Sequence, residues 1–137
     1  MTEKKVVLVI DENLPAGVIA NTAAVLGVSL GKLQPELVGE NLSDEVGSIR
    51  AGITTVALPI LKGNDELLRE LREKLKEFEP ELTVVDLIGA TRTTKSYEEY
   101  ASVLKSTPVS ELDYQGIALA GEKKIINKFT GNLGLLR

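Results

Sequence analysis

Residues 126–136 read Ile-Asn-Lys-Phe-Thr-Gly-Asn-Leu-Gly-Leu-Leu, which is the pattern of a short helix followed by an apolar tail. A helix end favours a residue that tolerates left-handed dihedral angles, and Gly131 supplies one. Beyond it, Leu133, Leu135 and Leu136 are free to fold back onto a hydrophobic core. The pattern therefore predicts a docked C-terminal tail, and it says more about the fold than about the activity.

The chain of 137 residues is long enough for one domain, which we place at residues 1–137. Its 16 basic and 20 acidic residues give a net charge of −4, so no overall positive charge attracts it to nucleic acid. The C-terminal third differs, because residues 91–137 carry 7 basic and 5 acidic side chains. We therefore expect no nucleic-acid partner, although a modest anion-facing surface near the C-terminus stays open.

The sequence contains neither cysteine nor histidine. Disulfides, thiolate zinc sites and imidazole acid–base catalysis are excluded as a result. We expect no cofactor and no bound metal. The first five residues lead into an apolar run that lacks the length and the cleavage site of a signal peptide, so we expect a cytoplasmic protein.

A β-branched run at residues 6–10, flanked by charges, predicts a strand buried on both faces. Residues 13–31 then carry no charge over 19 positions, which by length alone would suit a membrane span. Asn21 and Ser29, together with a proline and three glycines, dilute that apolarity. We therefore predict a helix that begins at Pro15 and is enclosed by the sheet and its neighbours, with no membrane contact.

The middle of the chain has a weaker pattern. Residues 32–51 are rich in Gly, Pro, Asn and Ser, which predicts a connection with at most a short extended piece at residues 37–38. The apolar run that follows predicts a second strand over residues 53–58, closed by Pro59.

The second half alternates helices and strands. We expect a helix capped by Asn64 or Asp65, a strand, a helix opened by the capping pair Ser96 and Glu99, a strand and a last helix. The expected ranges are 65–78, 82–88, 97–105, 116–121 and 122–130. Four short strands alternating with helices predict an α/β fold, a three-layer α/β/α domain with a four-stranded mixed, mostly parallel sheet.

Several stretches together resemble a known superfamily. They are Val-Leu-Val-Ile-Asp-Glu-Asn-Leu at residues 7–14, the charge-free helix, Gly-Ala-Thr-Arg-Thr at 89–93 and Thr-Gly-Asn-Leu at 130–133. In combination they resemble the class II peptidyl-tRNA hydrolase superfamily over most of the chain. Within it, residues 9–15, Pro-Ile-Leu-Lys at 59–62, Tyr-Glu-Glu-Tyr at 97–100 and the Leu-rich tail look most like domain-of-unknown-function family 2000.

The resemblance implies a catalytic lysine, aspartate and threonine, and this sequence departs from all three. The lysine position falls on Gly17, the aspartate position on Gly89 and the threonine position on Gln115. Glycine cannot orient a water molecule, protonate a leaving group or pair with a phosphate. The superfamily's Arg-Thr pair is retained at Arg92 and Thr93.

Candidate binding residues follow the predicted strands, because ligands of open α/β sheets bind beyond the carboxyl ends of strands. Asp11 and Asn13 follow the first strand, although acidic residues there also serve as caps or stay solvated. The guanidinium fork of Arg92 and the hydroxyl of Thr93 suit a carboxylate or a phosphate. Asn21, on a helix expected to be buried, either lines the same cleft or hydrogen-bonds within the core. We predict that these five residues bind a ligand.

Two functions stay open. The first is a cytoplasmic domain with a peptidyl-tRNA hydrolase-like scaffold that lacks the catalytic groups and binds a small ligand or a protein partner. The alternative is an active hydrolase of peptidyl-tRNA or a related ester that uses displaced residues such as Asp11, Asp86, Lys62 and Arg92. Self-association as a homodimer is a third interpretation, because Ala-rich and Leu-rich helix faces can form an interface.

Overall fold

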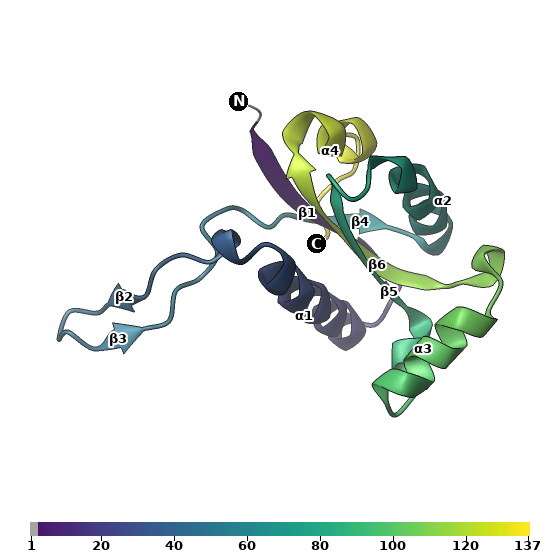
Figure 1. Cartoon of the computed structure of the whole chain (residues 1–137), viewed down its shortest axis with the longest axis horizontal. Coiled ribbons are helices and arrows are strands. Elements are labelled where there is room, and N and C mark those ends of the chain that lie inside the picture. Colours follow the sequence, from purple (N-terminus) through teal and green to yellow (C-terminus); the bar gives the residue numbers. More distant parts are fainter. Residues whose placement is uncertain (1–2) are drawn as a thin grey trace.

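A four-stranded mixed sheet forms the centre of the computed structural model, which describes residues 3–137 (Figure 1). The strands are β1 (Lys4–Asp11), β4 (Ile60–Gly63), β5 (Thr83–Ile88) and β6 (Tyr114–Glu122), in the order β4-β1-β6-β5. β1 pairs in parallel with β4, whereas β6 is antiparallel to both of its neighbours. The mixed sheet was predicted correctly, but only one adjacent pair is parallel, so the expectation of a mostly parallel sheet was wrong.

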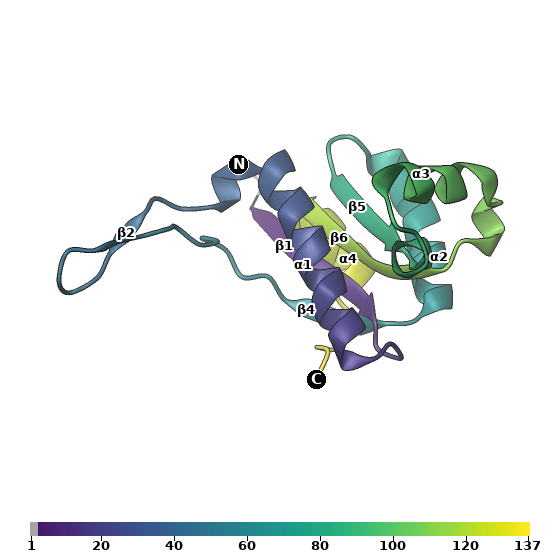
Figure 2. The same cartoon turned by 90° about the horizontal axis from the view of Figure 1, so that it is seen from below.

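Helices cover both faces of the sheet (Figure 2). The helix α1 (Ala16–Leu33) lies on one face, while α2 (Asp65–Leu75) and α4 (Lys123–Thr130) lie on the other. Alternate residues of β1 point into two separate apolar clusters, so Val7 packs toward α2 and α4 whereas Leu8 packs toward α1. A strand buried on both faces must be apolar throughout, which explains the unbroken run at residues 6–10.

The two predicted helix caps are present. The Asn64 side chain accepts a 2.8 Å hydrogen bond from the backbone N–H of Leu67 at the start of α2. At the start of α3 (Tyr97–Ser106), Ser96 Oγ accepts from the N–H of Glu99, whose own carboxylate accepts from the N–H of Lys95. Short 3₁₀ turns adjoin these helices. They are η2 (Lys76–Phe78), η3 (Gly89–Arg92) and η4 (Val109–Glu111).

The C-terminal tail docks as expected, but Gly131 does not act in the predicted way. Its φ of −61° is right-handed, so no left-handed cap ends α4. Glycine is instead required by space, because a Cβ there would come within 2.6 Å of the carbonyl oxygen of Asn127. The tail then pairs with β4: the N–H of Lys62 donates to the carbonyl of Gly134, and the N–H of Leu136 donates to the carbonyl of Ile60.

Residues 38–58 form a long arm that projects from the domain (Figure 1, Figure 2). The short turn η1 (Pro35–Leu37) leads into it, and β2 (Leu42–Ser43) pairs with β3 (Ile49–Arg50) near its tip. The predicted strand over residues 53–58 was wrong, because this segment is the returning leg of the arm. The pairing with β1 starts only after Pro59, whose carbonyl accepts from the N–H of Leu8.

The helix α1 is less enclosed than the sequence suggested. Its buried residues are Thr22, Leu26 and Leu30, which form the single row that faces the sheet. By length and composition alone the helix could cross a membrane. Only 17% of it is buried inside the domain. An apolar helix that contacts the sheet along one narrow row leaves much of its surface exposed.

Candidate functional site

Four loops meet at one end of the sheet, where β1, β4 and β5 finish and β6 begins; we call this the carboxyl end. Direct hydrogen bonds tie the loops together there. The N–H of Glu12 donates to the carbonyl of Gly63, and the N–H of Gly89 donates to the carbonyl of Asp113. The segments after β1 and β5, where the sequence placed candidate binding residues, share this end. The sequence did not predict that the residues before β6 would join them.

The five predicted ligand residues are spread across the carboxyl end. Asp11 and Asn13 are close together, because Asp11 Oδ1 accepts a 2.9 Å hydrogen bond from the N–H of Asn13 in a local turn. Arg92 and Thr93 lie exposed at η3, and β5 is separated from β1 by β6, about 10 Å between the two strands. Asn21 is exposed on α1, so its expected burial was wrong.

Two buried polar residues near this end form a contact that the sequence did not predict. Gln115 Nε2 donates a 2.9 Å hydrogen bond to Thr22 Oγ1, and Thr22 Oγ1 donates to the carbonyl of Val18. Gln115 is the extra residue of a β-bulge, since Gly116 pairs with Leu87 and the residue before Gln115 pairs with the next residue of β5. The bulge turns this amide toward α1. Its Oε1 is buried and finds no hydrogen-bond partner within residues 3–137.

Asp113 fills the space beside Gly89. A Cβ on residue 89 would clash with the carboxylate oxygens of Asp113, whose side chain is exposed. A carboxylate therefore lies next to a position that the resemblance assigns to an aspartate, although it comes from the residue that precedes β6. No local pattern in the sequence signals this approach, because the two residues are brought together only by the pairing of β5 with β6.

One pocket near these loops lies between α1 and α3, with a volume of about 380 Å³. Eight residues line it: Val25, Leu87, Thr91, Thr94, Lys95, Ser96, Tyr97 and Tyr100. None of the five predicted ligand residues is among them, but Arg92 and Thr93 belong to the same loop. We call this the α1–α3 pocket.

Ser96 and Tyr100 are hydroxyl-bearing residues of the α1–α3 pocket that retain free donor hydrogens. Tyr100 Oη accepts a 3.0 Å hydrogen bond from the N–H of Ile88, and Ser96 Oγ accepts from the N–H of Glu99. Neither hydroxyl donates to an acceptor in the part of the chain that the structure describes. Burial raises the pKa of Tyr100, so its phenol stays protonated and can donate at neutral pH.

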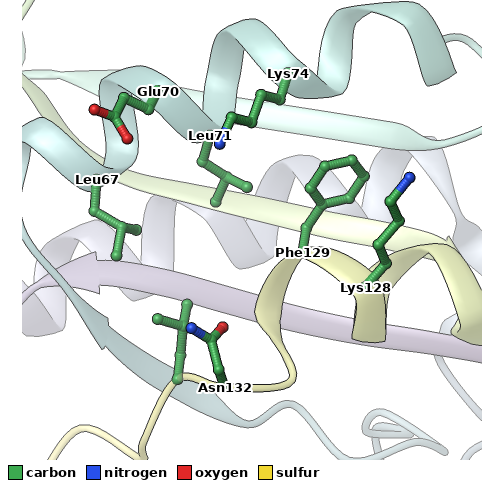
Figure 3. Close-up of a pocket in the computed structure, with 8 residues that line it drawn as sticks. Leu67, Glu70, Leu71, Lys74, Lys128, Phe129 and Asn132 are labelled. Atoms are coloured by element: carbon green, nitrogen blue, oxygen red, sulfur yellow. The ribbon is translucent and has the colours of Figure 1, made fainter.

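A second pocket lies on the other face of the sheet, between α2 and α4 (Figure 3). Leu67, Leu71 and Phe129 form its apolar walls, and Glu70 and Lys74 project beside them. Its volume is about 400 Å³. Charges of opposite sign flank this pocket, and it does not include the loops of the carboxyl end, so it is the weaker candidate for an anion site.

Asp86 has a structural partner on α2. It faces α2, where its Oδ2 accepts a 2.8 Å hydrogen bond from Arg72 Nε. Arg72 also donates a 2.7 Å hydrogen bond to Glu79. Burial lowers the pKa of Arg72, but the hydrogen bonds and charges of both carboxylates outweigh it and raise the pKa overall. Asp86 is therefore held away from Arg92 and Asp11.

Within residues 3–137, no group of three carboxylates converges as metal ligands would. The fold and the pocket thus define a three-layer α/β domain with a ligand-sized recess between α1 and α3. The chain belongs to the family described as protein of unknown function (DUF2000), whose sequence profile matches residues 4–137.

One solved structure shares the whole fold. It is the protein of unknown function Atu0240 from Agrobacterium tumefaciens strain C58, with a TM-score of 0.89 and 20% sequence identity over 98% of each chain. At that identity the likeness establishes the fold alone. No curated protein matches the chain.

Proposed function

We propose that this protein is a cytoplasmic binding domain that takes a small, partly apolar anion in the α1–α3 pocket. In this proposal the scaffold is peptidyl-tRNA hydrolase-like but lacks that superfamily's catalytic groups. The observation that carries the proposal is the lining of the pocket. Val25 and Leu87 offer apolar surface, while Ser96, Tyr100 and Lys95 offer two donor hydrogens and a cation.

This combination suits a carboxylate or a phosphate attached to a hydrocarbon group. Charge-assisted hydrogen bonds to an anion are about twice as strong as neutral ones, and the apolar walls add burial of the hydrocarbon. Arg92 and Thr93 lie in the same loop and can contact a ligand that extends beyond the pocket.

Loss of the catalytic groups supports binding without turnover. Gly17 faces open space, and a Cβ at Gly89 would meet the carboxylate of Asp113. Asp86, a member of the alternative hydrolase set, is paired with Arg72 on the α2 face. Asp11, the other carboxylate of that set, ends β1, which β6 separates from β5.

Nuclear magnetic resonance titration of the full chain tests the proposal. Phenyl phosphate and hexanoate serve as probes, since they share a hydrocarbon group and differ in the anion. We expect saturable shifts at the backbone amides of Leu87, Lys95 and Tyr97. Lys95→Ala should weaken binding of the tighter-binding probe about tenfold or more, whereas Lys105→Ala, in α3 but outside the pocket lining, should not. If neither probe gives saturable shifts there, the anion proposal is wrong.

A second candidate function is hydrolysis of peptidyl-tRNA, and Asp113 is the observation that favours it. Its carboxylate lies against Gly89, beside the position where the resemblance expects a catalytic aspartate. Turnover of a model peptidyl-tRNA by the wild-type chain, lost in both Asp113→Asn and Arg92→Ala, would replace the binding proposal. Equal turnover in all three proteins would point to a contaminating hydrolase.

A further inference from the structure

Exposed apolar side chains are concentrated in α1 and the arm. Of the fifteen large apolar residues that the structure leaves exposed, ten belong to these two segments. Those ten are Val25, Val28, Leu33, Val38, Leu42, Val46, Ile49, Ile53, Val56 and Leu58. Single exposed apolar residues are normal, but a contiguous group marks a contact surface.

The arm has a defined shape despite its exposure. Its two legs are joined by hydrogen bonds from the N–H of Gly39 to the carbonyl of Ile53 and from the N–H of Thr55 to the carbonyl of Leu37. At the tip, Asp44 Oδ1 accepts from two backbone N–H groups, and Gly47 takes the positive φ of 84° that the turn needs. An isolated two-stranded ribbon is only marginally stable in water, so an ordered arm of this kind calls for a supporting surface.

The outer side of α1 carries a row of small residues, which lets another helix approach closely. Ala20, Ala24, Gly27 and Gly31 follow one another at spacings of four, three and four residues, which places them along one side of the helix. A Cβ at Gly27 or Gly31 would meet nothing within 4 Å. Glycine weakens a helix interior, and here no contact within residues 3–137 requires it. Figure 2 looks onto α1, and no other described element lies in front of it.

We infer that two copies of this chain form a dimer, in which the α1 helices pack antiparallel about a two-fold axis and each arm lies on the partner. Both surfaces are on one chain and adjoin each other, because the arm continues from the C-terminal end of α1 through η1 (Figure 1). Such a self-complementary patch is what a two-fold contact uses. Small residues at this spacing let two helix backbones approach closely.

The dimensions and the charges agree with this arrangement. One leg of the arm, residues 38–46, spans about 26 Å or more when extended, and α1 is about 27 Å long. In an antiparallel pair each arm therefore passes the N-terminal end of the partner's α1. The arm carries three acidic residues and one arginine. The partner would present Arg92, Lys95 and the exposed ring of Tyr97 near that end.

A lipid surface is the competing occupant of the same apolar residues. It is disfavoured because the arm and the whole chain are acidic, whereas membrane surfaces are commonly anionic. Asn21 on the exposed side of α1 also favours a protein contact.

Sedimentation of the full chain over a dilution series tests the dimer. We expect a dimer for the wild type and a monomer for Val28→Glu, with association weakened roughly a hundredfold because each copy brings a carboxylate into the apolar contact. Val28 is 76% exposed, so the substitution should leave the monomer folded, which circular dichroism checks. Val109→Glu is the matched control, an exposed valine on η4 outside α1 and the arm.

Cross-linking tests the geometry, since the chain has no cysteine of its own. Ala24→Cys should form a disulfide with its own copy, and a mixture of Ile49→Cys and Tyr97→Cys chains should be joined by a short bis-maleimide. Val109→Cys should give neither product. A wild-type monomer at every concentration would overturn the dimer, as would binding to phosphatidylglycerol vesicles without self-association. The ligand titration is repeated on monomeric Val28→Glu. It tests ligand binding in the α1–α3 pocket without the dimer, so the two proposals can fail independently.

Discussion

Gln115 Nε2 donates a 2.9 Å hydrogen bond to Thr22 Oγ1, which joins the bulged start of β6 to the buried side of α1. Thr22 in turn donates to the carbonyl of Val18, so its oxygen is the acceptor and the orientation of the Gln115 amide is determined. Gln115 is 2% exposed and its Oε1 has no partner within residues 3–137. The Gln115 amide therefore has a partner for only one of its two polar atoms, and loss of this hydrogen bond should lower the free energy of unfolding.

Thr22→Val should destabilise the domain by about 1–3 kcal/mol, because both polar atoms of the Gln115 amide would then be buried without a protein partner. Urea unfolding measures the change. The double variant Thr22→Val with Gln115→Leu should cost less than the sum of the single variants, since the unpaired groups are removed together. Additive effects would show that the two side chains are not coupled.

Gly116→Ala should destabilise the domain by about 1–3 kcal/mol through overpacking. A Cβ there would come within 2.8 Å of Thr22 Cγ2 and 3.1 Å of Leu26 Cδ1, in the contact between β6 and α1. Gly17→Ala is the matched control, because a Cβ at residue 17 meets nothing within 4 Å. Thermal unfolding of both variants should separate them clearly, and equal melting temperatures would contradict the close packing of α1 on β6.

Asp86→Ala should cost about 1–3 kcal/mol, less than for a fully buried ion pair, because the Asp86 side chain is 23% exposed and Glu79 still contacts Arg72. The exposed pair of Glu73 with Lys76 provides the comparison, and Glu73→Ala should change the unfolding free energy by less than about 0.5 kcal/mol. Chemical denaturation gives both values. A loss of peptidyl-tRNA turnover in Asp86→Ala without any loss of stability would restore this residue to the hydrolase set.

Stability should fall at high pH because burial raises the pKa of both Tyr100 and Tyr114 above the ordinary value of 10.0. The folded state favours the neutral phenols, so the unfolded chain ionises first. This contribution is complete below pH 10.0 and declines as the pH rises through the pKa values of the folded state. Urea midpoints measured from about pH 8 to about pH 11 check the slope. Tyr100→Phe should flatten it, and an unchanged slope would contradict the assignment.

Gly27→Ala should have opposite effects on folding and on association. In the monomeric Val28→Glu background it should stabilise α1 by about 0.5–1 kcal/mol, as alanine does in an open helix position. In the wild-type background it should weaken the dimer, because a methyl group would stand between the two helices. Calorimetry and sedimentation report the two effects. Unchanged association would remove Gly27 from the interface.

The sequence alone predicted the elements whose signals are local. The strand at residues 6–10 and the caps at Asn64 and Ser96 formed as expected, because caps and apolar runs depend on residues a few positions apart. The docked tail was also predicted, although Gly131 acts through space rather than through a left-handed conformation.

Only the tertiary structure decided where those elements lie and which side chains meet. Residues 53–58 have the composition of a strand, but burial depends on distant partners, and none of the described elements covers the arm. The antiparallel place of β6 brings Asp113 to Gly89, and its bulge turns Gln115 toward Thr22. Strand pairing, register and burial are set by contacts between remote residues, so no local pattern could specify this end of the sheet.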